Sequence, residues 1–377
     1  MGRLPCQTLS TRPDIQTGRG PSIDLFCRVI DNFGDAGVAL RLARRLADLG
    51  QSVRLWMDQV PPLGQPDDAQ RFAIHLWSDP FPAVTPHPRV MALFGARLPE
   101  RYLEDMAHLS VAPTWINLEY LTAEAWATGC HGLASPHPRL PLTEYFFFPG
   151  VTPGTGGVVI EPNLDQEWAH FDRTAFLTRL GIPPDETPLM SLFSYDNAAL
   201  DDLIDACSNG PAPGWRILSF VTPALPRLAR CLGRSQLAPG DTIRQGALEL
   251  RILPWLSQDD YDRLLWSCDL NIVRGEDSFV RAQLAGRPLL WQPYVQSEAA
   301  HLAKLDAFLE HYTNGLPESL VQAVYALHHG FNQETGFTLP SVRQREDLKT
   351  HAQRWRQQIL ARGDLAEHLL TFKPNLA

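Results

Sequence analysis

Along the 377-residue chain, short continuous apolar runs alternate with segments in which apolar residues recur every three or four positions. This alternation predicts units of a strand followed by a helix. Residues 23–30 and 51–57 are short apolar runs that are typical of buried strands. Between them, over residues 38–49, apolar side chains return every three or four positions and form one face of a helix, which Gly50 ends. A strand, a loop, a helix and a strand in this order begin a parallel α/β domain.

The same rhythm continues to the C-terminus and predicts a second unit of this kind. The Gly, Pro and Thr content of residues 149–157 marks the boundary, and we take residues 144–149 as part of the preceding loop. The further predicted strands are 75–77, 90–94, 114–118, 189–193, 215–221, 248–253, 270–273 and 288–291. The further predicted helices are 168–180, 200–207, 259–267, 278–285, 318–327 and 342–362.

We therefore expect two Rossmann-like domains that face a central cleft. Residues 1–21 are polar, lack the apolar core of a signal peptide, and are expected to be a disordered leader. The first domain covers residues 22–160, a linker region 161–187, and the second domain 188–341. The helices of residues 342–377 are expected to pack back on the first domain. Ligands of such sheets bind where strands end and helices begin.

Composition and charge exclude several classes of protein. Hydrophobic residues make up 44% of the chain, so most of it folds. The net charge of −9 argues against a nucleic-acid partner, which needs a basic surface. There is no apolar run long enough to span a membrane, and the six cysteines form no C-x-x-C pair. We expect a cytoplasmic protein with reduced thiols and no membrane partner.

The loop of residues 31–37 is the first candidate for chemistry. It carries two carboxylates, Asp31 and Asp35, which suit a general base and an orienting group. Gly34 and Gly37 permit close backbone approach, and the helix that follows offers free N–H groups to an anion. The loop has no G-x-G-x-x-G pattern and no Walker lysine. The alternative is structural, with Asp35 capping the helix and Asp31 forming an Asx turn.

A second loop, which opens the helix predicted at 278–285, suits a nucleotide diphosphate. Arg274 can pair with phosphate, and Ser278 can donate a hydroxyl and a backbone N–H. Asp277 fits the hydroxyls of a sugar or ribose, because a carboxylate repels phosphate. Glu276 could do the same or face a positively charged substrate. The alternative is that Asp277 and Ser278 only cap the helix.

Aromatic residues follow two strands of the second half. Phe193 and Tyr195 come after one strand, and Trp255 and Gln258 come after another. Aromatic rings at strand ends can stack on a nucleobase, and Gln258 could read the edge of a pyrimidine. The alternative is that these rings belong to the core.

No metal site is expected from the sequence. The histidines and cysteines do not have the spacing of metal ligands. The D-x-D pair of Asp260 and Asp262 falls inside a predicted helix, where residues i and i+2 do not share a face.

Three segments together resemble one family of enzymes. FCRVIDNFGDAGVALRLARRLA, LFSYDN and DDYDRLLWSCDLNIVRGEDSFVRAQLAGRPLLWQ are similar to the EarP family, bacterial protein-arginine rhamnosyltransferases that modify elongation factor P. The resemblance runs from about residue 23 to the C-terminal helices. It implies a GT-B glycosyltransferase fold, with the acceptor on the first domain and the nucleotide sugar on the second.

The resemblance also implies a reaction. Rhamnose would pass from dTDP-β-L-rhamnose, with inversion and without a metal or other cofactor, to an arginine of elongation factor P, which then rescues polyproline-stalled ribosomes. Asp35 would be the base, Asp31 would orient the loop or the guanidinium, and Glu276 would support the acceptor or the transition state; which of the three is the base stays open. The implied donor-binding residues are Asn32, Phe33, Gly34, Phe193, Tyr195, Trp255, Gln258, Arg274, Gly275, Asp277 and Ser278.

Two alternatives remain at this stage. The chain could be a GT-B enzyme that uses another nucleotide sugar or acceptor, because hydroxyl recognition depends on pocket geometry. It could also be a non-catalytic protein that binds a nucleotide sugar or a translation factor, although the three carboxylates argue against this.

Overall fold

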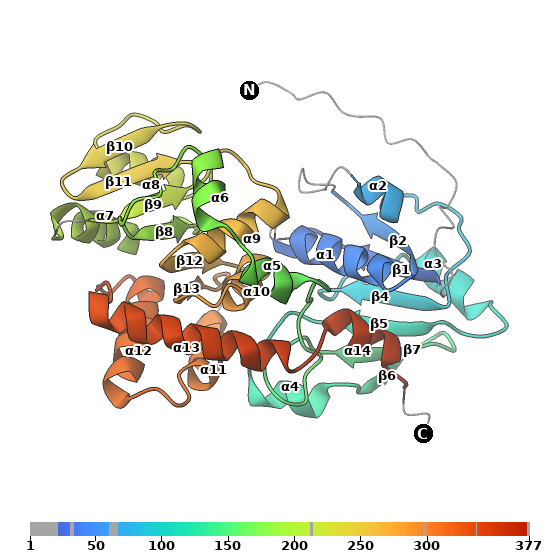
Figure 1. Cartoon of the computed structure of the whole chain (residues 1–377). Helices are drawn as coiled ribbons and strands as arrows, with labels where there is room; N and C mark the ends of the chain where they lie inside the picture. Colours follow the sequence, from blue (N-terminus) through green and yellow to red (C-terminus); the bar gives the residue numbers. More distant parts are fainter. Residues whose placement is uncertain are drawn as a thin grey trace.

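The computed structural model describes residues 22–30, 34–59, 67–211, 214–296, 299–336 and 338–374. The predicted leader therefore lies outside the described residues. Two sheets, each flanked by helices, lie side by side in this part of the chain (Figure 1).

The first sheet has seven strands in the order β3-β2-β1-β4-β5-β7-β6. Neighbouring strands are parallel, except that β6 is antiparallel to β7. The strands are β1 (Ser22–Cys27), β2 (Ser52–Met57), β3 (Ala73–Leu76), β4 (Arg89–Leu93), β5 (Thr114–Leu118), β6 (Ala134–Pro136) and β7 (Thr143–Phe147). The prediction of a loop over residues 144–149 is wrong for residues 144–147: the aromatic run forms β7, a half-buried strand that pairs in parallel with β5.

Strand β1 shows how the two faces of this sheet are covered. Ile23 and Leu25 pack beneath α1 (Gly34–Asp48) and α14 (Leu365–Thr371). Phe26 points to the opposite face, where α3 (Glu100–Ala107) closes a second cluster. The apolar run of β1 is thus a strand that is buried on both faces, as parallel sheets require.

The second sheet has six strands in the order β10-β11-β9-β8-β12-β13. The strands are β8 (Leu189–Leu192), β9 (Arg216–Ser219), β10 (Thr242–Gln245), β11 (Leu248–Ile252), β12 (Leu270–Arg274) and β13 (Leu289–Gln292). All pairs are parallel except the hairpin of β10 and β11, whose first strand the sequence pattern missed. Polar side chains along β10 explain this, because an exposed edge strand needs no apolar run.

Helices cover both faces of the second sheet. One face carries α7 (Ala199–Asn209), α8 (Leu225–Cys231) and α12 (Glu318–Gln333), and the other carries α6 (Arg173–Arg179), α9 (Gln258–Ser267) and α10 (Asp277–Leu284). The remaining helices are α2 (Asp68–Arg71), α4 (Ala125–Cys130), α5 (Leu164–Ala169), α11 (Ala300–Tyr312) and α13 (Val342–Leu360).

Two helix predictions need correction. Residues 168–180 do not form one helix: α5 ends at Ala169, and Asp172 starts α6 by accepting a hydrogen bond from the backbone N–H of Ala175 at 2.9 Å. At the C-terminus, only α14 lies on the first sheet, whereas α13 packs against α10 of the second half (Figure 1). The apolar face of α13 fits the gap left beside α10, so the chain crosses between the halves only after α13 ends.

The order of strands explains where a ligand can bind. Strand β1 lies between β2 and β4, and β8 lies between β9 and β12, so both sheets have a switch point where loops diverge. The loops at these points meet in pockets lined by residues of both halves. Two doubly wound domains that face a shared cleft constitute the GT-B fold. Across the described residues, no helix combines the length and apolar character that a membrane span requires.

A buried histidine makes the stability of the second domain depend on pH. Burial lowers the pKa of His328 to about 4, although its ring is hydrogen-bonded to the carbonyl of Val324. The unfolded chain, with a histidine pKa of about 6.5, binds the proton first. The folded state should therefore lose roughly 3 kcal/mol as the pH falls from about 6.5 to about 4. Chemical unfolding monitored by tryptophan fluorescence across this range would measure the loss.

The matched variants are His328→Gln and His329→Gln, which lie next to each other on α12. His329 pairs with Asp306 at the surface and serves as the control. The stability of the His328 variant should fall less over this pH range than that of the wild type. Equal pH dependence in both variants would contradict the assignment.

Candidate active site

A pocket opens between the two halves of the molecule. Its lining is Gly34, Phe193, Phe220, Trp255, Leu256, Gln258, Tyr261, Arg274, Asp277 and Ser278. Most of these residues were candidates from the sequence, whereas Phe220, Leu256 and Tyr261 were not. Phe220 directly follows β9, so the rule applied to Phe193, an aromatic residue after a strand, would have found it.

Aromatic rings form one wall of this pocket. The ring of Phe193 lies 6.0 Å from that of Phe220 and 6.4 Å from that of Trp255, measured between centroids. The rings of Phe220 and Trp255 are nearly parallel, at 20°. Trp255 is 45% exposed. The ring of Phe193 stands nearly perpendicular to the other two, at 88° and 79°. Exposed aromatic faces in such a cluster are suited to stacking against a nucleobase.

Arg274 is held at the edge of this wall. Its guanidinium lies 4.6 Å from the ring of Phe193 and 4.4 Å from the ring of Tyr195. Arg274 lines the pocket and Tyr195 does not. Tyr195 therefore affects the site through its contact with Arg274. Two rings that orient a buried guanidinium prepare it to bind an anion such as phosphate.

The turn after β12 brings three predicted residues to the pocket. Gly275 has a φ of +61°, a backbone conformation that is strained for a residue with a side chain. The glycine therefore allows the chain to turn from β12 into α10. The hydroxyl of Ser278 donates to the carbonyl of Arg274 and accepts from its N–H at 3.2 Å. The Ser278 hydroxyl already donates its proton to the Arg274 carbonyl. The backbone N–H groups at the start of α10 are therefore the donors that this turn can direct at an anion.

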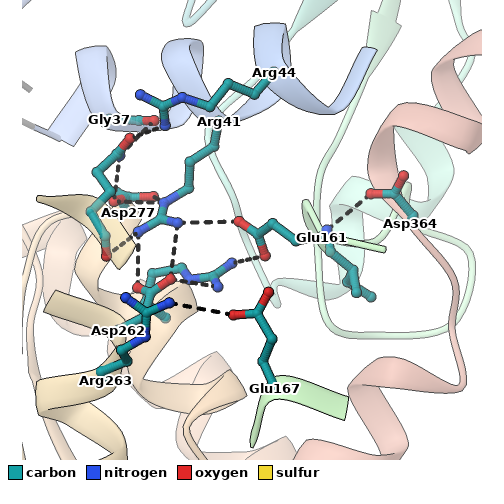
Figure 2. Close-up of polar contacts among 12 residues, drawn as sticks. Gly37, Arg41, Arg44, Glu161, Glu167, Asp262, Arg263, Asp277 and Asp364 are labelled. Carbon is teal, nitrogen blue, oxygen red and sulfur yellow. Dashed lines mark hydrogen bonds and ion pairs between the residues drawn. The ribbon is translucent and has the colours of Figure 1, made fainter. Parts of the chain in front are cut away.

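Gln258 and Asp277 line the pocket and also bind the first half of the molecule. Figure 2 shows Asp277 beside Arg41 of α1. The side-chain nitrogen of Gln258 donates to the carbonyl of Gly37 at 3.1 Å, and its oxygen accepts from Arg44. The carboxylate of Asp277 accepts from Nε of Arg41 at 2.9 Å. Both residues keep hydrogen-bonding capacity for a ligand, but the opposite domain sets their orientation.

The two predicted catalytic carboxylates that the structure describes lie near one tyrosine. Asp35 is fully buried in the first turn of α1 and accepts a hydrogen bond from the N–H of Ile30 at 2.8 Å. Burial raises the pKa of the Tyr120 phenol, and the charges of Asp35 and Glu276 raise it further. The pKa of this phenol is thus raised by a carboxylate from each half of the molecule. Asp31, Asn32 and Phe33 lie outside the described residues.

Glu276 already binds a cation. Its carboxylate pairs with Nζ of Lys304 on α11 at 2.8 Å. The same ammonium lies 5.7 Å from the ring of Tyr120 and 5.9 Å from that of Trp291. The ammonium is thus held by one carboxylate and two aromatic rings, an environment that a guanidinium also prefers.

Among the residues of the described ranges, no three or more His, Cys, Asp or Glu side chains gather as metal ligands would. The two aspartates of the D-x-D pair have different partners: Asp260 binds Arg179 on the surface, and Asp262 is buried against Arg41 and Arg281.

Comparison with known proteins identifies close relatives. A family model described as elongation factor P (EF-P) rhamnosyltransferase EarP matches residues 23–374. A protein-arginine rhamnosyltransferase of Pseudomonas putida is 42% identical over 93% of this chain and 98% of its own length. The Pseudomonas aeruginosa protein of the same name is 39% identical over the same shares.

A solved structure supports the same relationship. It is described as the structural basis for EarP-mediated arginine glycosylation of translation elongation factor EF-P. It matches 95% of this chain and all of its own chain with a TM-score of 0.67 and 32% identity.

The close approach of α1 to α10 predicts the effect of one substitution. A Cβ atom on Gly37 would lie 3.1 Å from the carboxyl carbon of Asp277, which Arg41 holds in place. Gly37→Ala should therefore move Asp277. If dTDP binds here, as the resemblance to the EarP family implies, its affinity should fall about tenfold in calorimetric titration, the effect of disturbing one charge-assisted hydrogen bond. Thermal stability should change little, because alanine favours the helix.

Gly129→Ala on α4 is the control, because nothing lies within 4 Å of its Cβ position. It should bind dTDP as the wild type does. An unchanged dTDP affinity in the Gly37 variant would show that the contact has no part in the site.

Proposed function

The chain belongs to the EarP family of elongation factor P rhamnosyltransferases, and from this we propose that it transfers L-rhamnose from dTDP-β-L-rhamnose to an arginine of elongation factor P. It is a protein-arginine rhamnosyltransferase by family, with relatives that cover nearly its whole length. The donor, the inverting course of the reaction and the identity of the acceptor arginine are the parts of this proposal that experiments must test.

One observation carries the proposal. Asp35 of the first domain follows Gly34 in α1, and Glu276 of the second directly precedes α10; their neighbours Gly34 and Asp277 both line the nucleotide pocket. An arginine side chain has a pKa above 12, so its nitrogens are protonated and delocalised at neutral pH. Two carboxylates from opposite sides can hold such a group and localise its electrons through charge-assisted hydrogen bonds.

From these positions we propose the following chemical roles. The acceptor nitrogen forms a bond to the anomeric carbon of rhamnose, and its proton passes to the carboxylate of Asp35. The bond from that carbon to the diphosphate oxygen breaks, and dTDP leaves with the electron pair. Attack on the face opposite the leaving group inverts the anomeric centre. Glu276 supports the guanidinium, and Asp31 is proposed to orient it.

Arg274 and the start of α10 suit the departing diphosphate. The guanidinium of Arg274 is already fixed between two rings, so little reorganisation is needed when charge develops on the leaving group. The aromatic wall of Phe193, Phe220 and Trp255 would hold the thymine. We propose that these residues together make the transfer independent of a metal.

The proposed acceptor also gives the cellular setting. A translation factor is modified where it works, so the reaction is proposed to occur in the cytoplasm. The rhamnosylated arginine would enable elongation factor P to rescue ribosomes stalled at polyproline.

Metal removal tests the role of Arg274 and α10. Initial rates measured in EDTA should remain within about twofold of those in Mg²⁺ or Mn²⁺, because the protein itself supplies the positive charge at the diphosphate. A rate that collapses in EDTA and returns on adding a divalent cation would contradict metal-independent transfer.

Intact mass spectrometry tests the reaction itself. Elongation factor P incubated with the enzyme and dTDP-β-L-rhamnose should gain the mass of one deoxyhexose, mapped to an arginine by fragmentation. Asp35→Asn should lower the rate by roughly 10²–10⁴-fold, since general base catalysis is lost. Glu276→Gln should also reduce transfer, and both variants should still bind dTDP.

The exposed variant Glu346→Gln serves as the control and should transfer at the wild-type rate. Folded wild-type enzyme that produces no mass gain would refute the proposed donor or acceptor. Full activity in the Asp35 variant would refute the assignment of the base.

A further inference from the structure

A buried cluster of charges joins the two domains and the linker next to the nucleotide pocket (Figure 2). It consists of Arg41 on α1, Glu161 in the linker, Asp262 on α9, and Asp277 and Arg281 on α10. Arg41, Asp262 and Arg281 are each at most 5% exposed. Charges buried to this extent are stable only when every one of them is paired.

Arg41 is the centre of this cluster. Its two terminal nitrogens bind both oxygens of Asp262 at 2.9 and 3.0 Å, and one of them also reaches Glu161 at 3.1 Å. Its third nitrogen, Nε, donates to Asp277 at 2.9 Å. Burial opposes the charge of Arg41, but the three carboxylates raise its pKa above the usual value. One guanidinium from the first domain thus holds carboxylates on α9, on α10 and in the linker.

The carboxylates of the cluster differ in how far they depend on Arg41. Asp262 and Glu161 each have a second cation, Arg281, at 2.7 and 2.8 Å. For Asp277, the ion pair with Arg41 is the only one that the described residues form. Its other polar contact is a weaker hydrogen bond from Gln258 at 3.4 Å. Loss of Arg41 would therefore release Asp277 first.

We propose that Arg41 is a positioning residue of the donor site, which acts by fixing the carboxylate of Asp277 toward the nucleotide sugar. Asp277 lines the pocket and Arg41 does not, so Arg41 acts through Asp277. Because Arg41 belongs to the first domain, Asp277 is oriented only when the two domains are closed. Donor binding and domain closure are thereby coupled. This inference rests on the proposed function only in assigning the pocket to a dTDP-linked donor.

Helix α1 supplies a matched control one turn away. Arg45 is buried to a similar degree and also binds two carboxylates, Asp364 at 2.8 Å and Glu367 at 2.7 Å. These partners belong to α14 and the residue before it, on the first domain and outside the nucleotide pocket. Arg45→Met therefore removes the same kind of ion pair without touching Asp277.

The experiment compares Arg41→Met, Arg41→Lys and Arg45→Met in the full-length enzyme. Calorimetry measures the Kd of dTDP, and initial rates measure the KM values of dTDP-β-L-rhamnose and of elongation factor P. Arg41→Met should raise the Kd of dTDP and the donor KM about tenfold, as expected when a charge-assisted hydrogen bond is lost. The KM of elongation factor P should stay within about twofold.

The other two variants complete the test. Arg41→Lys should recover part of the dTDP affinity, since an ammonium can reach one carboxylate but cannot reproduce the planar fork. Arg45→Met should lower the melting temperature and leave both donor constants unchanged. If Arg41→Met does not fold, the comparison of Arg41→Lys with Arg45→Lys provides the same contrast.

Three outcomes would overturn the inference: an unchanged dTDP affinity in folded Arg41 variants, equal increases in both KM values, or an equal effect of the Arg45 variant on dTDP binding. The calorimetry does not depend on transfer. Wild-type enzyme that binds dTDP but transfers no rhamnose would refute the proposed function, while the binding comparison would still decide the role of Arg41.

Discussion

The contact between the first turns of α1 and the first turn of α10 is the interaction on which the site depends. Gly37 allows the two helices to approach, and Arg41, one helical turn further, binds Asp277 across the gap. Asp35 lies in the first turn of the same helix, and Glu276 directly precedes α10. A single helix–helix contact therefore completes the pocket between the domains and lies beside the two carboxylates for which we propose a role toward the acceptor.

Buried charges at this contact serve geometry more than stability. Removing two charges from water costs about as much free energy as their attraction returns, and apolar residues of similar size would hold the domains together at least as well. A guanidinium differs because it fixes carboxylates in a planar, bidentate arrangement. The first domain contains a contrasting case: buried Asp24 binds Arg54 and Tyr102 far from the cleft. There the charges join strands and a helix of one domain, whereas the cluster of Arg41 joins two domains.

The donor and acceptor sides of the cleft use cations in different ways. On the proposed donor side, Arg274 lies against two aromatic rings, where its positive charge would face the proposed diphosphate. On the acceptor side, Lys304 neutralises Glu276 in the absence of another cation. A guanidinium in the position of the Lys304 ammonium would meet a carboxylate that already pairs with a positive charge. The arrangement matches a reaction between an anionic donor and a cationic acceptor, in which like charges must be kept apart.

Apolar spacing along the chain predicted the class of fold, and short segments predicted the loops for which we propose chemistry. Apolar periodicity located β1, α1, β2 and most strands of the second sheet, because local spacing decides which face of an element is buried. It failed where local signals mislead: the aromatic run of β7 resembled a loop beside prolines, and α13 gave no sign of which domain it would cover. Residues such as Asp35, Arg274 and Asp277 were found because they follow strands.

The tertiary structure alone decided which side chains meet. Arg41 and Asp277 are 236 positions apart, and no periodicity connects them. The same holds for the contact of Arg44 with Gln258 and for the placing of Tyr195 behind Arg274. Residue types within a short segment reveal what chemistry is possible there. Contacts between distant segments arise from packing of whole domains, so the pairing that orients the site becomes visible only once the chain has folded.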